Sequence, residues 1–214
     1  MYLILKQINK DEWWKADTPD EIIIGAILTQ QTQWSNVEKA MRNLKREGML
    51  SISRLADANL QSIERAIRPT GFYRQKATRL KEASERIMDN GGVKRVFSLP
   101  QKELYDILIS LKGVGMETAD SIALYGADKP TFVVDNYTWR VISRVYGREE
   151  PYDYGKIKEW VEGVTTRNAE LYKEMHSYFV ELGKSVCVKR DPICAQCPIS
   201  RICSYGKANG SHSR

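Results

Sequence analysis

The sequence lacks long hydrophobic runs, low-complexity tracts and repeats of fixed period. No apolar run approaches the roughly 18 residues that a membrane-spanning helix needs, and Lys6 interrupts the first apolar segment before a signal-peptide core can develop. We therefore expect a soluble cytoplasmic protein with no membrane partner. Hydrophobic residues at 42% and charged residues at 28% match an ordinary globular protein, so we expect disorder only at the ends, chiefly in a flexible tail at 207–214.

Strand patterns and interdomain linkers are also scarce. Only "TFVVD" at 131–135 looks strand-like, and we interpret it as a connector because it is so short. Elsewhere apolar residues recur at helical spacing: Thr18 and Pro19 predict a helix start before Ile22, Ile23, Ala26 and Ile27. Similar patterns begin near Trp34, Leu60 and Leu104. The sequence predicts an all-α fold.

Cysteine is confined to one short segment near the C-terminus. The segment "CVKRDPICAQCPISRIC" separates Cys187, Cys194, Cys197 and Cys203 by six, two and five residues. One close pair between two wider arms can enclose a single centre with four thiolates, either iron-sulfur or zinc. Structural zinc usually has two close pairs, so the spacing favours iron-sulfur. Lys189, Arg190 and Arg201 lie beside these ligands, where they could contact phosphates or offset the negative charge of the thiolates.

Positive charge exceeds negative charge, with a net value of +6. This excess favours a polyanionic partner, because phosphate contacts release condensed counterions. Basic residues also gather in "MRNLKREG" and "YRQKATRLKEASER", although a solvated helix face would look the same.

The stretch "LKGVGMETAD" at 111–120 predicts a tight turn between two helices. Gly113 and Gly115 let the backbone turn sharply and approach a partner closely. The N–H groups that open the following helix suit a phosphate oxygen.

Taken in order, five segments resemble those of helix-hairpin-helix DNA glycosylases of the endonuclease III branch, from about Pro19 to Tyr205. They are "LTQQTQ", "TGFYRQKA", "LKGVGMETAD", "VVDNYTWRV" and the cysteine segment. The resemblance implies a two-lobed fold: a helical barrel domain at 21–130 that holds the hairpin, and an iron-sulfur cluster domain formed by 1–20 and 131–206. It further implies a [4Fe-4S] cluster, and a monomer that binds double-stranded DNA with a damaged or mispaired base in the cleft between the lobes. In a prokaryote the protein would be associated with the nucleoid.

The resemblance also assigns roles to individual residues. Asp135 matches the catalytic aspartate, Gln31 the side chain that fills the gap left by the extruded base, and Phe72 the wedge into the opposite strand. Read without the family, Asp135 could cap a helix, Gln31 could bond a local backbone group and Phe72 could be core. The hairpin residues expected to contact DNA are Gly113, Val114, Gly115 and Thr118.

Glu117 stands where bifunctional members of this family carry the lysine that attacks the sugar. A carboxylate cannot form the imine that precedes strand cleavage. Lys112 is nearby but occupies a different position. We therefore expect base removal without strong lyase activity.

An alkylated purine such as 3-methyladenine is the favoured substrate. Such a base is cationic and gains from an aromatic face and a carboxylate, which Trp34 and Glu117 could supply, with Trp13 or Trp14 as a further face. This combination is similar to 3-methyladenine glycosylases of the endonuclease III branch. Trp34 could instead pack in the core.

Two alternatives stay open. One is a glycosylase for thymine or uracil opposite guanine, although those relatives usually carry tyrosine in place of Glu117 and a neutral pyrimidine gains less from a buried acid. The other is a noncatalytic DNA-binding module with a structural metal centre. Asn136 and Tyr137 depart from the threonine and histidine common after the aspartate, and His176 fits a buried position with or without an active role.

Overall fold

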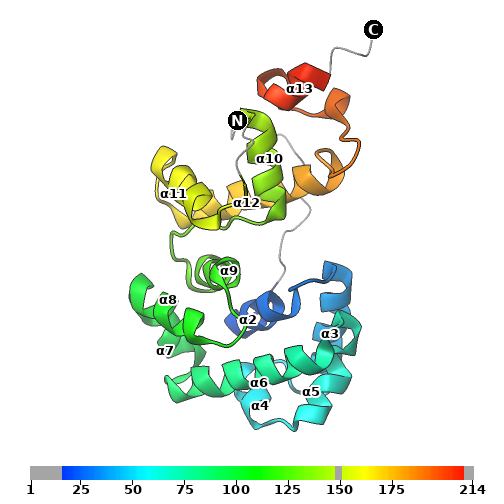
Figure 1. Cartoon of the computed structure of the whole chain (residues 1–214). Helices are drawn as coiled ribbons and strands as arrows, with labels where there is room; N and C mark the ends of the chain where they lie inside the picture. Colours follow the sequence, from blue (N-terminus) through cyan, green and yellow to red (C-terminus); the bar gives the residue numbers. More distant parts are fainter. Residues whose placement is uncertain (1–15, 148–150, 210–214) are drawn as a thin grey trace. The chain divides into compact units, whose positions relative to one another are not determined.

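The computed structural model describes residues 16–147 and 151–209. All regular elements within these ranges are helices, which confirms the all-α prediction (Figure 1). The chain divides into two compact units, one from Ala16 to Lys129 and one that takes up the chain from Pro130 onward. None of the described helices combines the length and the apolar character needed to cross a membrane.

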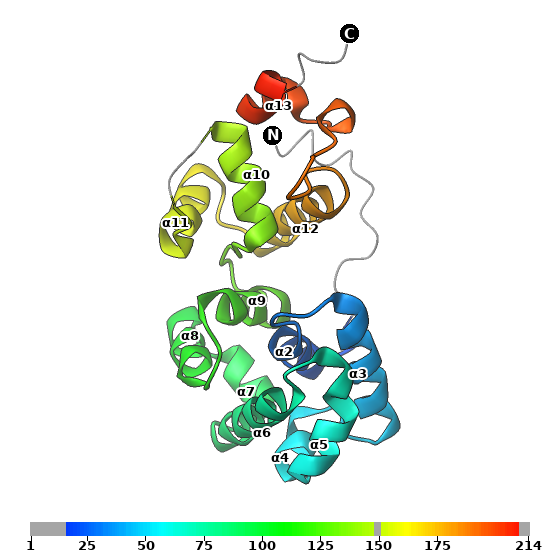
Figure 2. The ribbon, with the colours of Figure 1, turned by 45° about the vertical axis from the view of Figure 1, so that its right-hand side comes forward.

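The first unit is a helical bundle whose central element is α2 (Figure 2). Helix α2 packs against α3, α6 and α9. The bounds in this unit are α2 (Pro19–Leu28), α3 (Trp34–Arg46), α4 (Ile52–Asp57), α5 (Leu60–Ile67), η1 (Arg68–Thr70), α6 (Tyr73–Asp89), α7 (Gly92–Ser98), α8 (Gln101–Ser110) and α9 (Met116–Ala127).

Helix α2 begins where the sequence predicted. The Thr18 side chain accepts a hydrogen bond from the N–H of Glu21, and Pro19 occupies the first helical position. The predicted apolar stripe was too narrow, however, because Ile24 and Leu28 are also fully buried. A helix enclosed by neighbours on several sides buries most of its circumference rather than one stripe.

The second unit is organised around α10 and α12, which pack against each other. Its described elements are α10 (Asn136–Tyr146), α11 (Tyr154–Val164), α12 (Ala169–Ser185), η2 (Cys194–Gln196), η3 (Ser200–Ile202) and α13 (Ser204–Asn209). Helix α13 extends into 207–209, which we had expected to be part of the flexible tail. The remaining tail residues, 210–214, lie outside the described ranges.

The segment "TFVVD" is a connector, as predicted, and it is fully buried up to Val134. The Phe132 ring meets the rings of Tyr172 and Phe179 edge to face, with centroids 5.5 and 6.4 Å apart. The N–H of Phe132 donates to the Glu162 carboxylate at 2.7 Å. These contacts fix the backbone that leads directly into Asp135.

Candidate functional site

Asp135 is the N-cap of α10, so the capping role considered from the sequence is real. Its Oδ1 accepts a hydrogen bond of 2.7 Å from the N–H of Thr138. Its Oδ2 lies 3.6 Å from Nε2 of His176, which projects from α12. The Asp135 side chain keeps 16% of its surface exposed, whereas that of His176 keeps 5%. One oxygen is therefore fixed by a helix end and the other faces an imidazole.

Two opposing influences act on the pKa of Asp135. Burial raises it, because a carboxylate loses solvation in the protein interior. The imidazole of His176, 3.6 Å from Oδ2, and the N–H of Thr138 lower it, and the net result is a pKa below the usual value. Asp135 is thus held as an anion while it is mostly shielded from water, which makes it suited to stabilise a nearby positive charge.

In the first unit, the hairpin between α8 and α9 depends on Gly113. This residue has φ +81°, and a Cβ there would come within 2.5 Å of Nε of Arg79. Gly115 has an extended backbone with φ −93°, and a Cβ at that position would meet nothing within 4 Å. Our expectation that both glycines serve the turn is therefore wrong for Gly115, whose bare surface leaves room for a molecule outside this unit.

The other hairpin residues expected to contact DNA differ in exposure. The Val114 side chain is buried, so only its backbone can face a ligand. Thr118 is half-buried and accepts a hydrogen bond from Gln30. Because Gly115 has no side chain to cap α9, no side-chain cap is present at that helix start. Its N–H groups are therefore suited to an anion, and contact with a phosphate there stays a prediction.

Sequence reasoning missed Gln30, which joins two of the five family segments. Its Nε2 donates to the Gly113 carbonyl oxygen at 2.8 Å and to Thr118 Oγ1 at 3.2 Å. Its Oε1 accepts from Arg79 Nη1 at 3.3 Å. Only the adjacent Gln31 was singled out from the sequence. The partners of Gln30 lie far away along the chain, so no local pattern could have revealed them.

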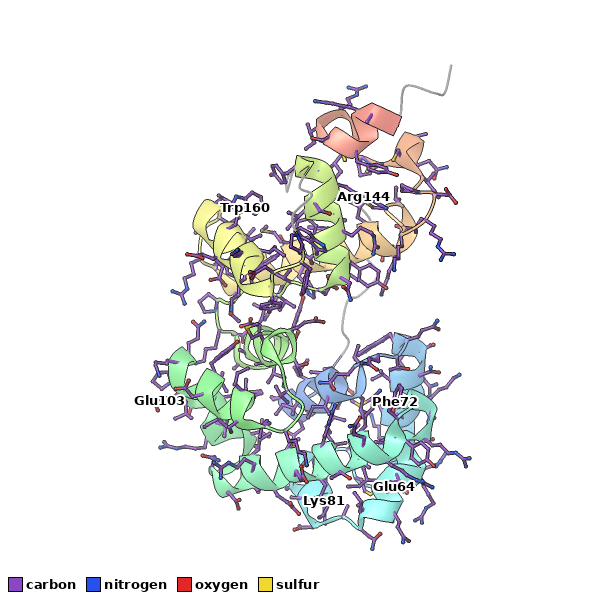
Figure 3. The ribbon with its side chains drawn as sticks, viewed as in Figure 1. Glu64, Phe72, Lys81, Glu103, Arg144 and Trp160 are labelled. Carbon is purple, nitrogen blue, oxygen red and sulfur yellow. The ribbon has the colours of Figure 1, made fainter. Side chains whose placement is uncertain are left out.

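Gln31 and Phe72 share an uncommon backbone conformation. Their φ angles are 55° and 45°, in the left-handed region that non-glycine residues seldom adopt. Phe72, at the start of α6, is 66% exposed, so it is not part of the core (Figure 3). Gln31 is also exposed. Strained, exposed residues of this kind concentrate at ligand-binding sites.

A second residue absent from the sequence predictions, Lys76, connects the loops that carry these two side chains. Its ammonium group donates to the carbonyl oxygens of Leu28 and Thr70, both at 2.9 Å. Lys76 is 3% exposed. Burial and the nearby charge of Arg79 lower the pKa of Lys76 to about 8. Leu28 ends the helix before Gln31, and Thr70 precedes Phe72, so Lys76 ties the two loops together.

The residues expected to bind the base are only partly described. Trp34 is the first residue of α3 and is half-buried, so it is not a fully buried core residue. Glu117 lies in the first turn of α9 and is exposed, which corrects the expectation of a buried acid. Trp13 and Trp14 lie outside the described residues.

The four cysteines come together on one cavity of the second unit. Cys187, Cys194, Cys197 and Cys203 line it, together with apolar side chains of α10 and α12. Among the described residues, no group of three or more His, Cys, Asp or Glu side chains is arranged to hold a metal ion. All four thiols line one cavity, so the donor set fits a single centre with four thiolate ligands, either iron-sulfur or zinc.

Arg144 supplies positive charge beside this cavity. From α10, its Nη1 donates to Cys187 Sγ at 3.2 Å and to the Val188 carbonyl oxygen at 2.8 Å, and its guanidinium lies 4.8 Å from the Tyr205 ring centroid (Figure 3). It therefore joins α10 to the cysteine segment. The basic residues predicted to reach phosphates, Lys189, Arg190 and Arg201, are all exposed.

The two residues after Asp135 differ in environment. Asn136 is exposed, whereas the Tyr137 ring packs against α12 at Gly183, where a Cβ would approach Tyr137 Cδ1 to 2.7 Å. The Arg140 guanidinium lies 5.2 Å from the same ring centroid. Tyr137 therefore has a packing role in this chain.

Comparison with known proteins gives a consistent result. Residues 24–165 match the model of the HhH-GPD superfamily base excision DNA repair protein. A candidate DNA repair glycosylase of Methanocaldococcus jannaschii, MJ1434, is 40% identical over 204 residues, covering 94% of this chain and 92% of that protein. The thymine/uracil-DNA glycosylase of Pyrobaculum aerophilum is 30% identical over 90% of this chain and 83% of its own length.

Among solved structures, the 3-methyladenine DNA glycosylase MagIII of H. pylori, bound to 1,N6-ethenoadenine, superposes with a TM-score of 0.72 and 27% identity. The match covers 86% of this chain and 96% of that chain. The relatives thus include enzymes for both substrate classes considered from the sequence.

Proposed function

Because the chain belongs to the HhH-GPD superfamily of base excision DNA repair proteins and is a DNA glycosylase, we propose that it is monofunctional and that its preferred substrates are alkylated purines such as 3-methyladenine. The observation that carries this proposal is the contrast between two carboxylates. Asp135 is mostly buried and held ionised, and Glu117 occupies the hairpin position at which an amine would be needed for strand cleavage.

Asp135 would act on the sugar. Cleavage of the glycosidic bond creates positive charge on the deoxyribose, and a fixed anion in a site of low dielectric stabilises that charge without reorganising. The same carboxylate can accept a proton from the attacking water. Extrusion of the target base costs a few kcal/mol, and the cost is smallest for a damaged or mispaired base. Gln31 and Phe72, both exposed, would occupy the space that the base leaves and the opposite strand.

The absence of an amine at position 117 limits the reaction to base removal. Strand cleavage by this family's route requires an amine to form a Schiff base with the sugar, and Glu117 cannot do so. Lys112 is exposed and lies 3.9 Å from Glu82, on the α8 side of the turn. It therefore does not replace the amine at the start of α9.

The first unit would recognise the base. Trp34 offers an indole face to a cationic purine, and Glu117 offers a carboxylate for a charge-assisted hydrogen bond. Gln30 links the first turn of α9 to the loop that precedes Trp34, through its bond to Thr118. The likeness to a 3-methyladenine DNA glycosylase bound to 1,N6-ethenoadenine supports this assignment.

The cofactor would be a [4Fe-4S] cluster held by Cys187, Cys194, Cys197 and Cys203. When bound, the cluster would cross-link the segment that contains the four thiolates and so stabilise the fold. Burial raises the pKa of the Cys194 and Cys197 thiols, and neighbouring thiolates raise it further. Binding must therefore release protons and offset mutual repulsion. Arg144 would contribute to this through its hydrogen bond to Cys187 Sγ.

A second candidate function is excision of thymine or uracil opposite guanine. It is favoured by the 30% identity to the Pyrobaculum enzyme over most of both chains. The exposure of Glu117 also weakens the sequence argument against it, because a solvated carboxylate penalises a neutral base less than a buried one.

A panel of duplexes tests both proposals. Release of free base would be measured under single-turnover conditions from duplexes with 3-methyladenine, 7-methylguanine, hypoxanthine, uracil opposite guanine or thymine opposite guanine. We expect fastest release of the methylated purines and no strand cleavage without added alkali. Faster release from the mismatches would establish the second candidate instead. No release from any duplex, with DNA binding retained, would favour a noncatalytic module.

Asp135→Asn is the companion variant. Asparagine also caps helices, so the start of α10 should persist. Excision should fall by about 100-fold or more, because a general base or a charge stabiliser typically contributes that much. DNA affinity should change little. Full activity in this variant would remove Asp135 from its proposed role.

A further inference from the structure

The proposed chemistry gives no role to His176, a buried ionisable group close to Asp135. His176 is 4% exposed and lies on α12, facing the N-terminus of α10. Its Nε2 is 3.6 Å from Oδ2 of Asp135, while Oδ1 of the same carboxylate is bound by the N–H of Thr138. The two oxygens of Asp135 are thus held from two different elements.

We propose that His176 is a positioning residue for Asp135: from α12, its imidazole fixes the orientation of the carboxylate for the glycosylase reaction. This inference rests on the proposed catalytic role of Asp135. His176 itself does not contact substrate in this account, and it acts only through the carboxylate.

Burial explains why Asp135 needs this support. A shielded carboxylate is driven toward its neutral form, which could neither stabilise a cationic sugar nor accept a proton from water. The N–H groups at a helix start favour the anion, but they act on Oδ1 alone here. An imidazole beside Oδ2 supplies the remaining stabilisation. Without it, burial would be opposed only by Thr138.

The surroundings hold the imidazole in place. Tyr172 lies one helical turn before His176 on α12 and is fully buried, and Phe179 is also buried. Both rings pack edge to face against Phe132 of the connector that leads into Asp135. The connector and α12 are therefore packed together on both sides of His176 along that helix. This packing fixes the distance between the helix that carries the imidazole and the segment that carries the carboxylate.

Two residues lower the pKa of Asp135: His176 from α12 and Thr138 from α10. Tyr172 and Tyr178 are the other buried titratable side chains of α12 within one turn of His176. The Tyr152 hydroxyl donates to the carbonyl oxygen of Val134, next to Asp135. Thr131 and Phe132 of the connector carry no charge. The imidazole of His176 is therefore the group beside Asp135 that a substitution would remove.

The experiment compares His176→Leu and His176→Gln with the wild-type holoprotein, and Ser177→Ala serves as the matched control. Ser177 is a buried polar neighbour on α12 that donates to the Glu174 carbonyl oxygen. Single-turnover excision would be measured from pH about 5 to about 9 on the duplex that the wild type processes fastest. DNA affinity and thermal unfolding would be measured on the same samples.

For His176→Leu we expect the excision rate near neutral pH to fall about tenfold or more, and the acid limb of the pH profile to move to higher pH. The dissociation constant for DNA should stay within about twofold of the wild type. His176→Gln should show a smaller change in the same direction, because its amide can donate a hydrogen bond but carries no charge. Ser177→Ala should keep the wild-type pH profile.

A purely structural histidine gives a different result. The unfolding temperature would fall, but the acid limb and the rate of the folded protein would match the wild type, and the proposal would be overturned. If His176→Leu does not fold, an unchanged acid limb in His176→Gln overturns it equally. The proposed function fails separately, through full activity of Asp135→Asn or through the absence of base release by the wild type.

Discussion

The side-chain amide of Gln30 donates a hydrogen bond of 2.8 Å to the carbonyl oxygen of Gly113. This bond joins the loop after α2 to the hairpin before α9. The amide also reaches Thr118 Oγ1 and receives a bond from Arg79. Two segments that the family uses at the DNA surface are thus held by one side chain.

Gln30→Ala should therefore destabilise the protein and weaken DNA binding together. Loss of two to three partly exposed hydrogen bonds should cost about 1 to 2 kcal/mol, measurable by denaturant unfolding. The adjacent Gln31→Ala is the matched control, since Gln31 is exposed and in a left-handed conformation. It should leave stability nearly unchanged, because alanine keeps the same left-handed strain, while it reduces excision. Equal stability loss in both variants would contradict this division of roles.

Phe72→Gly separates function from stability in a second loop. Relief of the left-handed strain at φ 45° should offset the extra entropy of glycine in the unfolded chain, so the free energy of unfolding should change by about 0 to +1 kcal/mol. Little burial is lost, because the ring is 66% exposed. Base excision should fall about tenfold or more if the ring helps to open the duplex. A clear drop in the free energy of unfolding would show instead that the Phe72 ring contributes to packing.

Glu117→Lys should create a lyase activity that we expect to be absent from the wild type. An amine at the start of α9, where the helix N-terminus favours its unprotonated form, could attack the sugar and form an imine. Borohydride should then trap the variant, but not the wild type, on DNA with a susceptible base. Lys112→Ala is the control for the nearby amine. Adding it to the wild type or to Glu117→Lys should leave the amount of borohydride-trapped complex unchanged. Trapping of the wild type would show that a different amine serves as nucleophile.

The lowered pKa of Lys76 predicts that the stability of the protein depends on pH in the alkaline range. Its pKa is about 8 in the folded protein and 10.5 ordinarily, so between these values the unfolded chain binds more protons and stability rises with pH. The difference in unfolding free energy between the wild type and Lys76→Met should therefore grow by about 3 kcal/mol from pH about 8 to about 10.5.

At neutral pH the same variant should be less stable than the wild type, because the carbonyl groups of Leu28 and Thr70 lose their donor. Urea unfolding at several pH values gives both quantities. A difference that stays constant through this pH range would mean that Lys76 titrates normally.

The cysteine segment predicts a visible chromophore. Purified protein should be brown and contain about four iron atoms per chain, and Cys194→Ser should lose colour and thermal stability together. Arg144→Lys tests the hydrogen bond to Cys187 Sγ: it should keep the cluster but make it easier to lose on dilution with a chelator. A colourless wild type that contains one zinc would overturn the cofactor assignment.

Much of the fold followed from local patterns. Thr18 and Pro19 marked the start of α2, "TFVVD" was correctly taken as a connector, and the four clustered cysteines line one cavity. These features depend on neighbours within a few turns of chain, where sequence carries the information directly. The narrow apolar stripe assigned to α2 was wrong because burial on several sides depends on helices that come later in the chain.

The sequence by itself determined the chemical inventory: an acid in place of an amine at 117, a carboxylate at 135 positioned to cap a helix, and four thiols at the end. Tertiary structure alone decided that His176 faces Asp135, that Gln30 and Lys76 bind carbonyl groups of distant segments, and that Phe72 is exposed. The physical reason is how far apart along the chain the contacting residues lie. Helix caps and turns arise from contacts between near neighbours in the chain, whereas the ionisation of a buried group depends on residues that only packing brings near.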